Sequence, residues 1–222
     1  MEELKTERLF HYPETTIAWE YLSQFLFPWE ALDGLAAYIA KLGASLPSSE
    51  YDELEGNVYI SKSAKVAPTA YIGGPTVICS GAEIRHGAFI RGGAIVGRNA
   101  VVGNSVELKN CILFDGVQVP HFNYVGDSIL GYRSHMGAGA VTSNVKSDKT
   151  LVSVAVDGMR LETGRKKLGA ILSDYVEVGC NSVLNPGTVI GMHSNVYPLS
   201  SVRGYVPENT IYKSRSEIVP KR

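Results

Sequence analysis

A strict six-residue recurrence of aliphatic residues constrains the fold of this 222-residue chain more than any other feature. From position 60 to position 108, every sixth residue is isoleucine, valine or leucine: Ile60, Val66, Ile72, Ile78, Ile84, Ile90, Val96, Val102 and Leu108. Four residues later, nearly every repeat has a small residue: Ala64, Ala70, Thr76, Ala82, Ala88, Ala94 and Ala100. A helix repeats about every 3.6 residues and a strand about every two, so neither element alone explains this period.

The period of six suits short strands joined by tight corners, three of which would close one coil of 18 residues. Successive coils would stack about 4.8 Å apart and bury their aliphatic residues against one another. The recurrence shifts by one residue after Leu108 and again after Val125, and a second block follows: Leu172, Val178, Leu184, Ile190, Val196 and Val202. We therefore predict an all-β fold, a parallel β-helix, and leave a solenoid with a different repeat as the weaker alternative.

The repeat is flanked by one helical segment and interrupted by one further segment. Residues 17–42 favour helix, divided at Pro28 because proline breaks a helix interior but suits its first turn. Residues 145–170 lack the repeat, and the turn pair Asp157-Gly158 predicts a hairpin arm that protrudes from the solenoid. We expect an N-terminal helical region and linker (1–54), a β-helix domain with the arm (55–212) and a C-terminal tail (213–222).

Composition and charge narrow the classes of function. The net charge of -1 offers no basic excess for nucleic acid. The chain has no run of about 18 apolar residues that could cross a membrane, and its start lacks the pattern of a secretory signal. Three widely spaced cysteines, Cys79, Cys111 and Cys180, fit reduced thiols better than disulfides. We expect a cytoplasmic protein with no nucleic-acid or membrane partner.

Two cations are separated by one predicted coil. Arg91 and Lys109 each follow an aliphatic position and lie 18 residues apart, so they should stack on the same face. Two stacked cations repel each other unless an anion lies beside them, and this favours a phosphate site. The alternative is an exposed ladder of charges that only keeps the surface soluble.

A histidine follows one coil later. His121 lies in the string VPHFNYVG, and an imidazole with a pKa of about 6.5 is a suitable general base near neutral pH. A structural role is the alternative for a lone histidine. His86 occupies the matching place two coils earlier, which raises the question of a metal site on stacked histidines.

The hexapeptide pattern resembles that of the hexapeptide-repeat superfamily, whose coils form a left-handed parallel β-helix. Residues 102–144 resemble the acetyltransferase half of bifunctional N-acetylglucosamine-1-phosphate uridylyltransferase/glucosamine-1-phosphate acetyltransferase. Residues 157–191, with their GRKKLG string, are more similar to archaeal sugar-1-phosphate nucleotidylyltransferases that carry an amino-sugar acetyltransferase domain. The resemblance covers roughly residues 55–205 and implies a hexapeptide-repeat acyltransferase.

The resemblance implies a role for each matching residue. The expected catalytic pair is the base His121 and Asn144, which matches an asparagine near the point of acetyl transfer. The expected substrate-binding residues are Arg91, Lys109, Tyr124 and His135. The expected cofactor-binding residues are Ala138, Gly139, Cys180, Lys166 and Lys167. The basic pair Lys166 and Lys167 would meet coenzyme A phosphates, or would simply be a solvated run of charge.

Several positions depart from the related sequences. His135 replaces a sugar-binding asparagine, and Val145 replaces a tyrosine of the bacterial enzyme, where the archaeal type is also aliphatic. Thr150 and Ser153 stand where the archaeal type has lysines. These departures leave the base in place and put the identity of the acceptor sugar in doubt.

The expected reaction is therefore transfer of an acetyl group from acetyl-CoA, as co-substrate, to the amine of glucosamine- or galactosamine-1-phosphate for nucleotide-sugar synthesis. The resemblance also implies a homotrimer with sites between neighbouring subunits. The main alternative is a non-catalytic sugar-nucleotide-binding or regulatory module, because no nucleotidylyltransferase domain is recognised in the chain. A zinc-dependent lyase is disfavoured because no two of the five histidines lie close in sequence, so no bound metal is predicted.

Overall fold

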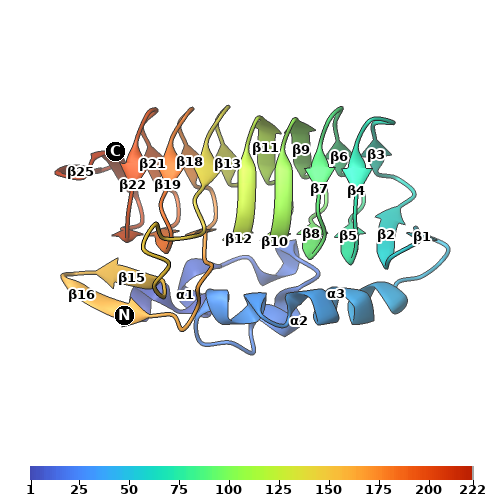
Figure 1. The fold of residues 1–222 in the computed structure, drawn as a ribbon, viewed down its shortest axis with the longest axis horizontal. Coiled ribbons are helices and arrows are strands. Elements are labelled where there is room, and N and C mark those ends of the chain that lie inside the picture. Colours follow the sequence, from blue (N-terminus) through green and yellow to red (C-terminus); the bar gives the residue numbers. More distant parts are fainter. Residues whose placement is uncertain (222) are drawn as a thin grey trace.

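The computed structural model describes residues 1–221, and most of them form a parallel β-helix with three faces (Figure 1). The N-terminal helices pack against one face, which we call the covered face. It comprises β2 (Val58–Ser61), β5 (Thr76–Ile78), β8 (Ala94–Val96), β17 (Ala170–Leu172), β20 (Thr188–Ile190) and β23 (Tyr205–Val206). The site face comprises β4 (Tyr71–Ile72), β7 (Phe89–Ile90), β14 (Val141–Thr142), β19 (Val183–Leu184) and β22 (Ser201–Val202). Two longer strands, β10 (Glu107–Leu113) and β12 (Tyr124–Leu130), run across both faces.

The rear face is the third side of the coil. It comprises β3 (Lys65–Val66), β6 (Glu83–Ile84), β9 (Val101–Asn104), β11 (Gln118–His121), β13 (His135–Met136), β18 (Glu177–Val178), β21 (Asn195–Val196) and β24 (Thr210–Ser214). In Figure 1 the chain climbs this face, crosses the upper corner and descends the site face while advancing from right to left. This sense of winding is left-handed, so the predicted left-handed β-helix is confirmed.

The strand register explains the two shifts in the repeat. Ile78 pairs with Val96 at the regular spacing of 18, but Val96 pairs with Leu113 and Leu113 with Leu130 at a spacing of 17. Each shorter coil turns from the site face to the covered face at a single left-handed residue, Asn110 or Asp127, both at φ 49°. Asparagine and aspartate tolerate this conformation better than other non-glycine residues.

The inward aliphatic residues form the core. From Ile78 onward the predicted column is buried, with Ile78, Ile90 and Val96 at 0% exposure. At the first coil, Val66 remains 38% exposed because no earlier coil covers it. Stability therefore depends on stacking of coils rather than on any one repeat.

An N-terminal region of short helices packs along the covered face. Its elements are η1 (Glu2–Leu4), α1 (Thr6–Leu9), η2 (Pro13–Thr15), α2 (Trp19–Leu22), η3 (Pro28–Leu32) and α3 (Leu35–Ala44). Helix is thus less continuous than the expected 17–42: Pro28 opens a 3-10 turn, and α3 begins only after Gly34. The region covers outward-facing aliphatic residues that are all fully buried: Val77, Ile95, Ile112, Ile129, Ile171 and Val189.

Four further strands complete the described structure. In the arm expected at 145–170, β15 (Ser153–Val156) and β16 (Met159–Glu162) form an antiparallel hairpin whose turn residues Asp157 and Gly158 have φ of 48° and 77°. Ahead of the first coil, β1 (Tyr51–Leu54) pairs antiparallel with β2. The expected C-terminal tail contains β25 (Glu217–Pro220), which pairs with β24 and extends the rear face. None of the helices in residues 1–221 is long and apolar enough to cross a membrane.

Candidate functional site

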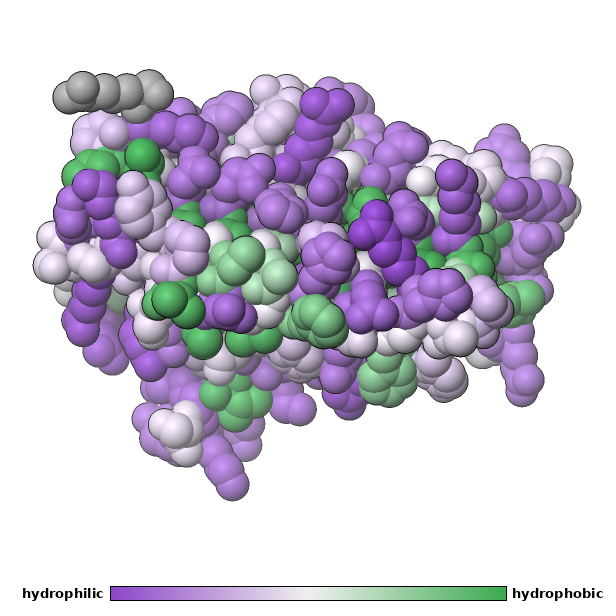
Figure 2. Space-filling view, turned by 90° about the horizontal axis from the view of Figure 1, so that it is seen from above, coloured by the Kyte–Doolittle hydropathy of each residue, from purple (hydrophilic) through white to green (hydrophobic). Residues whose placement is uncertain are grey.

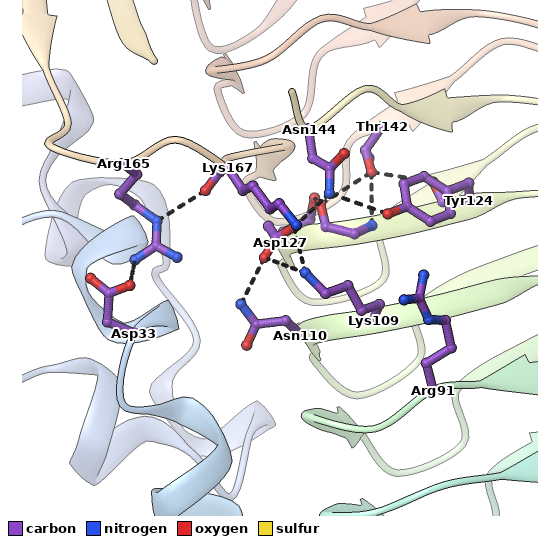
Figure 3. Close-up of polar contacts among 12 residues, drawn as sticks. Asp33, Arg91, Lys109, Asn110, Tyr124, Asp127, Thr142, Asn144, Arg165 and Lys167 are labelled. Carbon is purple, nitrogen blue, oxygen red and sulfur yellow. Dashed lines mark hydrogen bonds and ion pairs between the residues drawn. The ribbon is translucent and has the colours of Figure 1, made fainter. Parts of the chain in front are cut away.

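A polar cluster lies at the corner between the site face and the covered face (Figure 3). The Asp127 carboxylate is at its centre and only 2% exposed. Lys109 Nζ lies 3.2 Å from each carboxylate oxygen, Asn110 Nδ2 donates to Oδ1 at 2.9 Å, and Asn144 Nδ2 donates to Oδ2 at 2.5 Å. The second proton of Asn144 Nδ2 points to the Tyr124 hydroxyl oxygen at 3.2 Å. We call these five residues the Asp127 cluster.

The chain holds the Asp127 cluster in place through three stacked coils. The 17-residue coil places Lys109 and Asn110 directly beside Gly126 and Asp127 of the next strand. The segment that returns from the arm then closes the corner, because Leu168 N–H donates to Asn144 O at 3.0 Å and Gly169 N–H to Asp127 O at 2.8 Å. Burial raises the pKa of Tyr124, and the negative charge of Asp127 raises it further. The Tyr124 hydroxyl therefore stays protonated near neutral pH.

Arg91 and Lys109 do lie on adjacent coils, since Ile90 pairs with Leu108, but each cation has its own carboxylate. Arg91 forms an ion pair with Glu107 at 2.9 Å, and this hydrogen bond raises the pKa of the guanidinium. Lys109 pairs with Asp127. The repulsion between the two cations is therefore already offset by carboxylates of the same chain. Their stacking alone no longer indicates a bound phosphate.

A second group of predicted residues lines the corner between the rear face and the site face, which we call the His121 corner. Gly139 N–H donates to His121 O at 3.0 Å, and Asn181 N–H donates to Ala138 O at 2.9 Å, so successive coils stack here. His121 and Cys180 are exposed. Within residues 1–221, the His121 ring has no hydrogen-bond partner.

Figure 2 views the molecule from the side opposite the N-terminal helices, where the His121 corner lies, and shows a mostly hydrophilic surface with scattered hydrophobic residues. Two large apolar side chains belong to this corner, Phe122 at 60% exposure and Leu199 at 79%. Both occupy left-handed positions, with φ of 54° and 60°. Such a backbone is costly for bulky residues.

His135 does not join the Asp127 cluster. It lies on the rear face, where its Nδ1 is 2.8 Å from Glu177 Oε2. Both line a shallow cleft of ≈ 520 Å³ that also includes Arg133 and Tyr175. In a single chain, His135 therefore lies on a different face from Lys109.

The basic pair lies on the segment that returns from the arm. Lys167 O accepts a hydrogen bond from Arg165 Nε at 3.1 Å, and Arg165 forms an ion pair with Asp33 of the N-terminal region at 2.5 Å. Figure 3 shows the Lys167 side chain extending toward the Asp127 cluster. Lys166 is exposed. Lys167 thus lies nearer to Lys109 and Tyr124, two of the residues expected to bind substrate, than to the His121 corner.

The sequence interpretation missed Asn110, Asp127 and Glu107. A signal was present, because Asn110 and Asp127 occupy a corner position where neighbouring coils have Gly93 and Gly169. A polar residue at this corner in each of the two places where the repeat shifts marks side chains that can meet across coils.

The two cations should respond differently to substitution. Lys109→Ala would leave the nearly buried Asp127 carboxylate without its counter-ion, and breaking a buried pair costs about 3–5 kcal/mol. Arg91→Ala removes a largely exposed pair, which is worth roughly 0–1 kcal/mol. Thermal melting of the two variants should therefore show a clear loss for Lys109→Ala only. Equal melting temperatures would mean that Asp127 is solvated rather than paired.

Comparison with known proteins finds one matching family and several related sequences. Residues 74–197 match the family described as the GMPPB C-terminal domain. The bifunctional sugar-1-phosphate nucleotidylyltransferase/acetyltransferase of Sulfurisphaera tokodaii is 37% identical over 109 residues, 49% of this chain and 27% of the relative. The bifunctional protein GlmU of Methanococcus maripaludis is 31% identical over 207 residues, 91% of this chain and 50% of the relative. The chain thus spans at most about half the length of these relatives.

Solved structures resemble the chain less closely in sequence. The acetyltransferase domain of PglB from Neisseria gonorrhoeae, in complex with acetyl coenzyme A, is 16% identical with a TM-score of 0.34, and the match covers 75% of this chain and 58% of that one. PerB from Caulobacter crescentus, in complex with CoA and GDP-perosamine, is 18% identical with a TM-score of 0.27 and matches 74% of this chain and 57% of that one.

Proposed function

Since the chain belongs to the GMPPB C-terminal domain family, whose match spans more than half of it, we propose that it is a sugar N-acetyltransferase on a β-helix. The proposed reaction transfers an acetyl group from acetyl-CoA to the amine of an amino-sugar phosphate, glucosamine- or galactosamine-1-phosphate. The name of the Sulfurisphaera tokodaii relative, a bifunctional sugar-1-phosphate nucleotidylyltransferase/acetyltransferase, supports acetyl transfer linked to sugar-1-phosphate chemistry.

One observation carries the proposal: His121, Tyr124 and Asp127 follow one another at intervals of three residues along one coil. This spacing puts the exposed imidazole at one border of the site face and the Asp127 cluster at the other, with Tyr124 between them. A sugar phosphate lying across this face would have its amine beside the base.

The chemistry follows from these positions. The amine nitrogen attacks the thioester carbonyl carbon, its proton passes to the unprotonated ring nitrogen of His121, and the carbon–sulfur bond breaks. The imidazolium then returns the proton to the departing thiolate, so that the products are the amide and the free thiol of coenzyme A. His121 is exposed in the isolated chain, and this leaves its ring accessible to both substrates.

The His121 corner offers donors to the acyl group. Gly139 N–H is already used by His121 O, whereas Ala138 N–H has no partner among residues 1–221. In the proposed complex, Ala138 N–H donates to the thioester carbonyl oxygen, which becomes negatively charged during attack. The pantetheine arm would continue along the corner past Cys180.

The Asp127 cluster offers contacts to the acceptor. Tyr124 can donate its hydroxyl proton, because that oxygen accepts from Asn144. Arg91 and Lys109 would contact the phosphate while remaining paired with their carboxylates, and Lys167 would add a further positive charge. The three cations would attract the phosphate, and the carboxylates of Glu107 and Asp127 would weaken that attraction.

A second copy of the chain would be needed to bring His135 to the acceptor. His135 and Lys109 lie on different faces, so both can meet one acceptor only across an interface between chains. We propose the homotrimer that the resemblance implies, in which the rear face of one subunit approaches the site face of its neighbour.

A non-catalytic binding module remains the second candidate, and one observation favours it. The His121 ring has no orienting hydrogen-bond partner in the described chain. Such a module would bind the sugar phosphate or nucleotide without transfer.

The identity of the acceptor can be tested by release of the coenzyme A thiol from acetyl-CoA. Glucosamine-1-phosphate, galactosamine-1-phosphate, glucosamine and UDP-glucosamine would be compared at equal concentration. We expect the two sugar phosphates to be acetylated. Glucosamine should be acetylated with a much higher KM, because it lacks the phosphate. Preference for the unphosphorylated sugar would contradict the assigned phosphate contacts.

A further inference from the structure

Two exposed aromatic rings lie side by side on the first coils of the site face. Tyr71 of β4 pairs in register with Phe89 of β7, and their ring centres are 5.4 Å apart at an angle of 54°. The two residues are 60% and 43% exposed. Single exposed apolar residues are ordinary on a protein surface, whereas neighbouring ones form a patch that can bind a ligand. We call these two residues the aromatic pair.

The Tyr71 ring has a flat surface open to solvent. Gly73, two residues later on the same coil, has no side chain, and a Cβ atom there would lie 3.2 Å from Cε1 of Tyr71. The edge of the ring therefore extends over Gly73, and at 60% exposure the ring leaves a face uncovered. A nucleobase can stack on such a face whatever its identity, because every base has a π-face.

The aromatic pair continues the proposed acceptor site. Phe89 lies two coils before Tyr124, and Tyr71 lies three coils before it, roughly 14 Å away at about 4.8 Å per coil. The cations Arg91 and Lys109 lie on the two coils between Tyr124 and Tyr71. An acceptor with its amine at the Tyr124 end and its phosphate at the cations therefore directs that phosphate toward the aromatic pair.

Arg91 can still bind an anion beside the aromatic pair. Its Nη1 donates to Glu107 Oε1 at 2.9 Å, and its other N–H groups have no hydrogen-bond partner within residues 1–221. The Arg91 side chain is 47% exposed. A guanidinium group can donate to two phosphate oxygens at once. Because Glu107 weakens the attraction for a single phosphate, a diphosphate, with its greater negative charge, suits this position better.

We propose that the site face extends to the aromatic pair and binds nucleoside diphosphate amino sugars in addition to sugar 1-phosphates. The base stacks on Tyr71 and Phe89, and the diphosphate contacts Arg91 and Lys109. The amine stays beside His121, as in the proposed function, on which this inference rests. A sugar 1-phosphate occupies the same site without the aromatic contact and therefore binds more weakly.

Calorimetric titration of the full chain tests the contact with the base. Pyrophosphate carries the charge of the diphosphate without a base, so UDP and GDP should both bind more tightly than pyrophosphate. Tyr71→Ala should weaken UDP binding by roughly 5- to 150-fold and leave pyrophosphate binding unchanged. Tyr71→Phe keeps the ring and should bind UDP nearly as tightly as the wild type. UDP and GDP binding no tighter than pyrophosphate would overturn the proposal.

Tyr197→Ala is the matched control. Tyr197 is 46% exposed, but it lies near the last coils, away from the aromatic pair, so its substitution should not change UDP binding. Sedimentation of Tyr71→Ala would test whether the pair is instead a contact between subunits. A smaller assembly with UDP affinity like that of the wild type would assign the pair to such a contact and overturn the nucleotide site.

Kinetics with two acceptors link the site to acetyl transfer. The wild type should acetylate UDP-glucosamine with a lower KM than glucosamine-1-phosphate, and Tyr71→Ala should raise the KM for UDP-glucosamine only. If the wild type acetylates neither acceptor, the proposed function fails, and the titrations still decide whether the aromatic pair binds a nucleotide. If both are acetylated with equal KM and Tyr71→Ala changes neither value, the proposed function stands and this inference fails.

Discussion

His121→Ala should lower turnover by about 10²–10⁴-fold while the protein melts at the wild-type temperature. The loss is large because the amine must give up a proton as it attacks the thioester, and no other imidazole lies along this coil. The melting temperature should not change because the ring is exposed and without hydrogen-bond partners in residues 1–221. Steady-state kinetics with acetyl-CoA and thermal melting on the same preparation would measure both quantities.

His86→Ala is the matched control for this substitution. His86 O accepts from Asn104, and Asn104 pairs with His121, so the two histidines occupy the same corner two coils apart. His86 is also exposed, and its turnover should match that of the wild type. Unchanged turnover of His121→Ala would remove His121 from the mechanism. Loss of activity in proportion to loss of folded protein would assign it a packing role instead.

Trp29→Ala should cause a large loss of stability, about 3–5 kcal/mol. Trp29 lies in η3, is 1% exposed, and stacks on Phe27 with ring centres 4.9 Å apart. Its removal would leave a cavity between the N-terminal region and β12 of the β-helix. For a chain of this size, a melting temperature lower by roughly 6–20 °C is expected.

Leu26→Ala is the control for apolar truncation in the same region. Leu26 is 55% exposed, so its substitution should change the melting temperature by no more than a few degrees. If Trp29→Ala melted like Leu26→Ala, the N-terminal region would not be packed firmly on the covered face.

The β-helix could be predicted because its core depends on one residue in six. The column from Ile78 to Val96 is buried as the period requires, and even the two shifts correspond to real 17-residue coils. The covering of one face could also have been predicted. In every third repeat an aliphatic residue, such as Val77 or Ile95, precedes the inward one and would otherwise be exposed.

The ends of the chain were less predictable because they do not follow the repeat. Whether Pro28 opens an α-helix or a 3-10 turn depends on how η3 packs against β12. The pairing of β25 with β24 likewise depends on a free edge at the last coil of the rear face. Neither contact leaves a periodic signal in the sequence.

The site was predicted in part, and the reason is geometric. The spacing of 18 correctly places Arg91 beside Lys109, because it depends only on the backbone. It says nothing about Glu107 or Asp127, whose contacts depend on side-chain direction at a corner. The separation of His135 from the site face could have been inferred, because the register pairs it with Gln118 of the rear face.

The most direct test of the account is the mass of the acceptor after incubation with the wild-type protein and acetyl-CoA. The account predicts that glucosamine- or galactosamine-1-phosphate gains one acetyl group on nitrogen, with release of an equal amount of coenzyme A thiol. The corresponding N-acetylated sugar phosphates, whose amines are blocked, should gain nothing. Binding of the amino-sugar phosphates and acetyl-CoA without any acetylated product would contradict the central claim and favour the non-catalytic module.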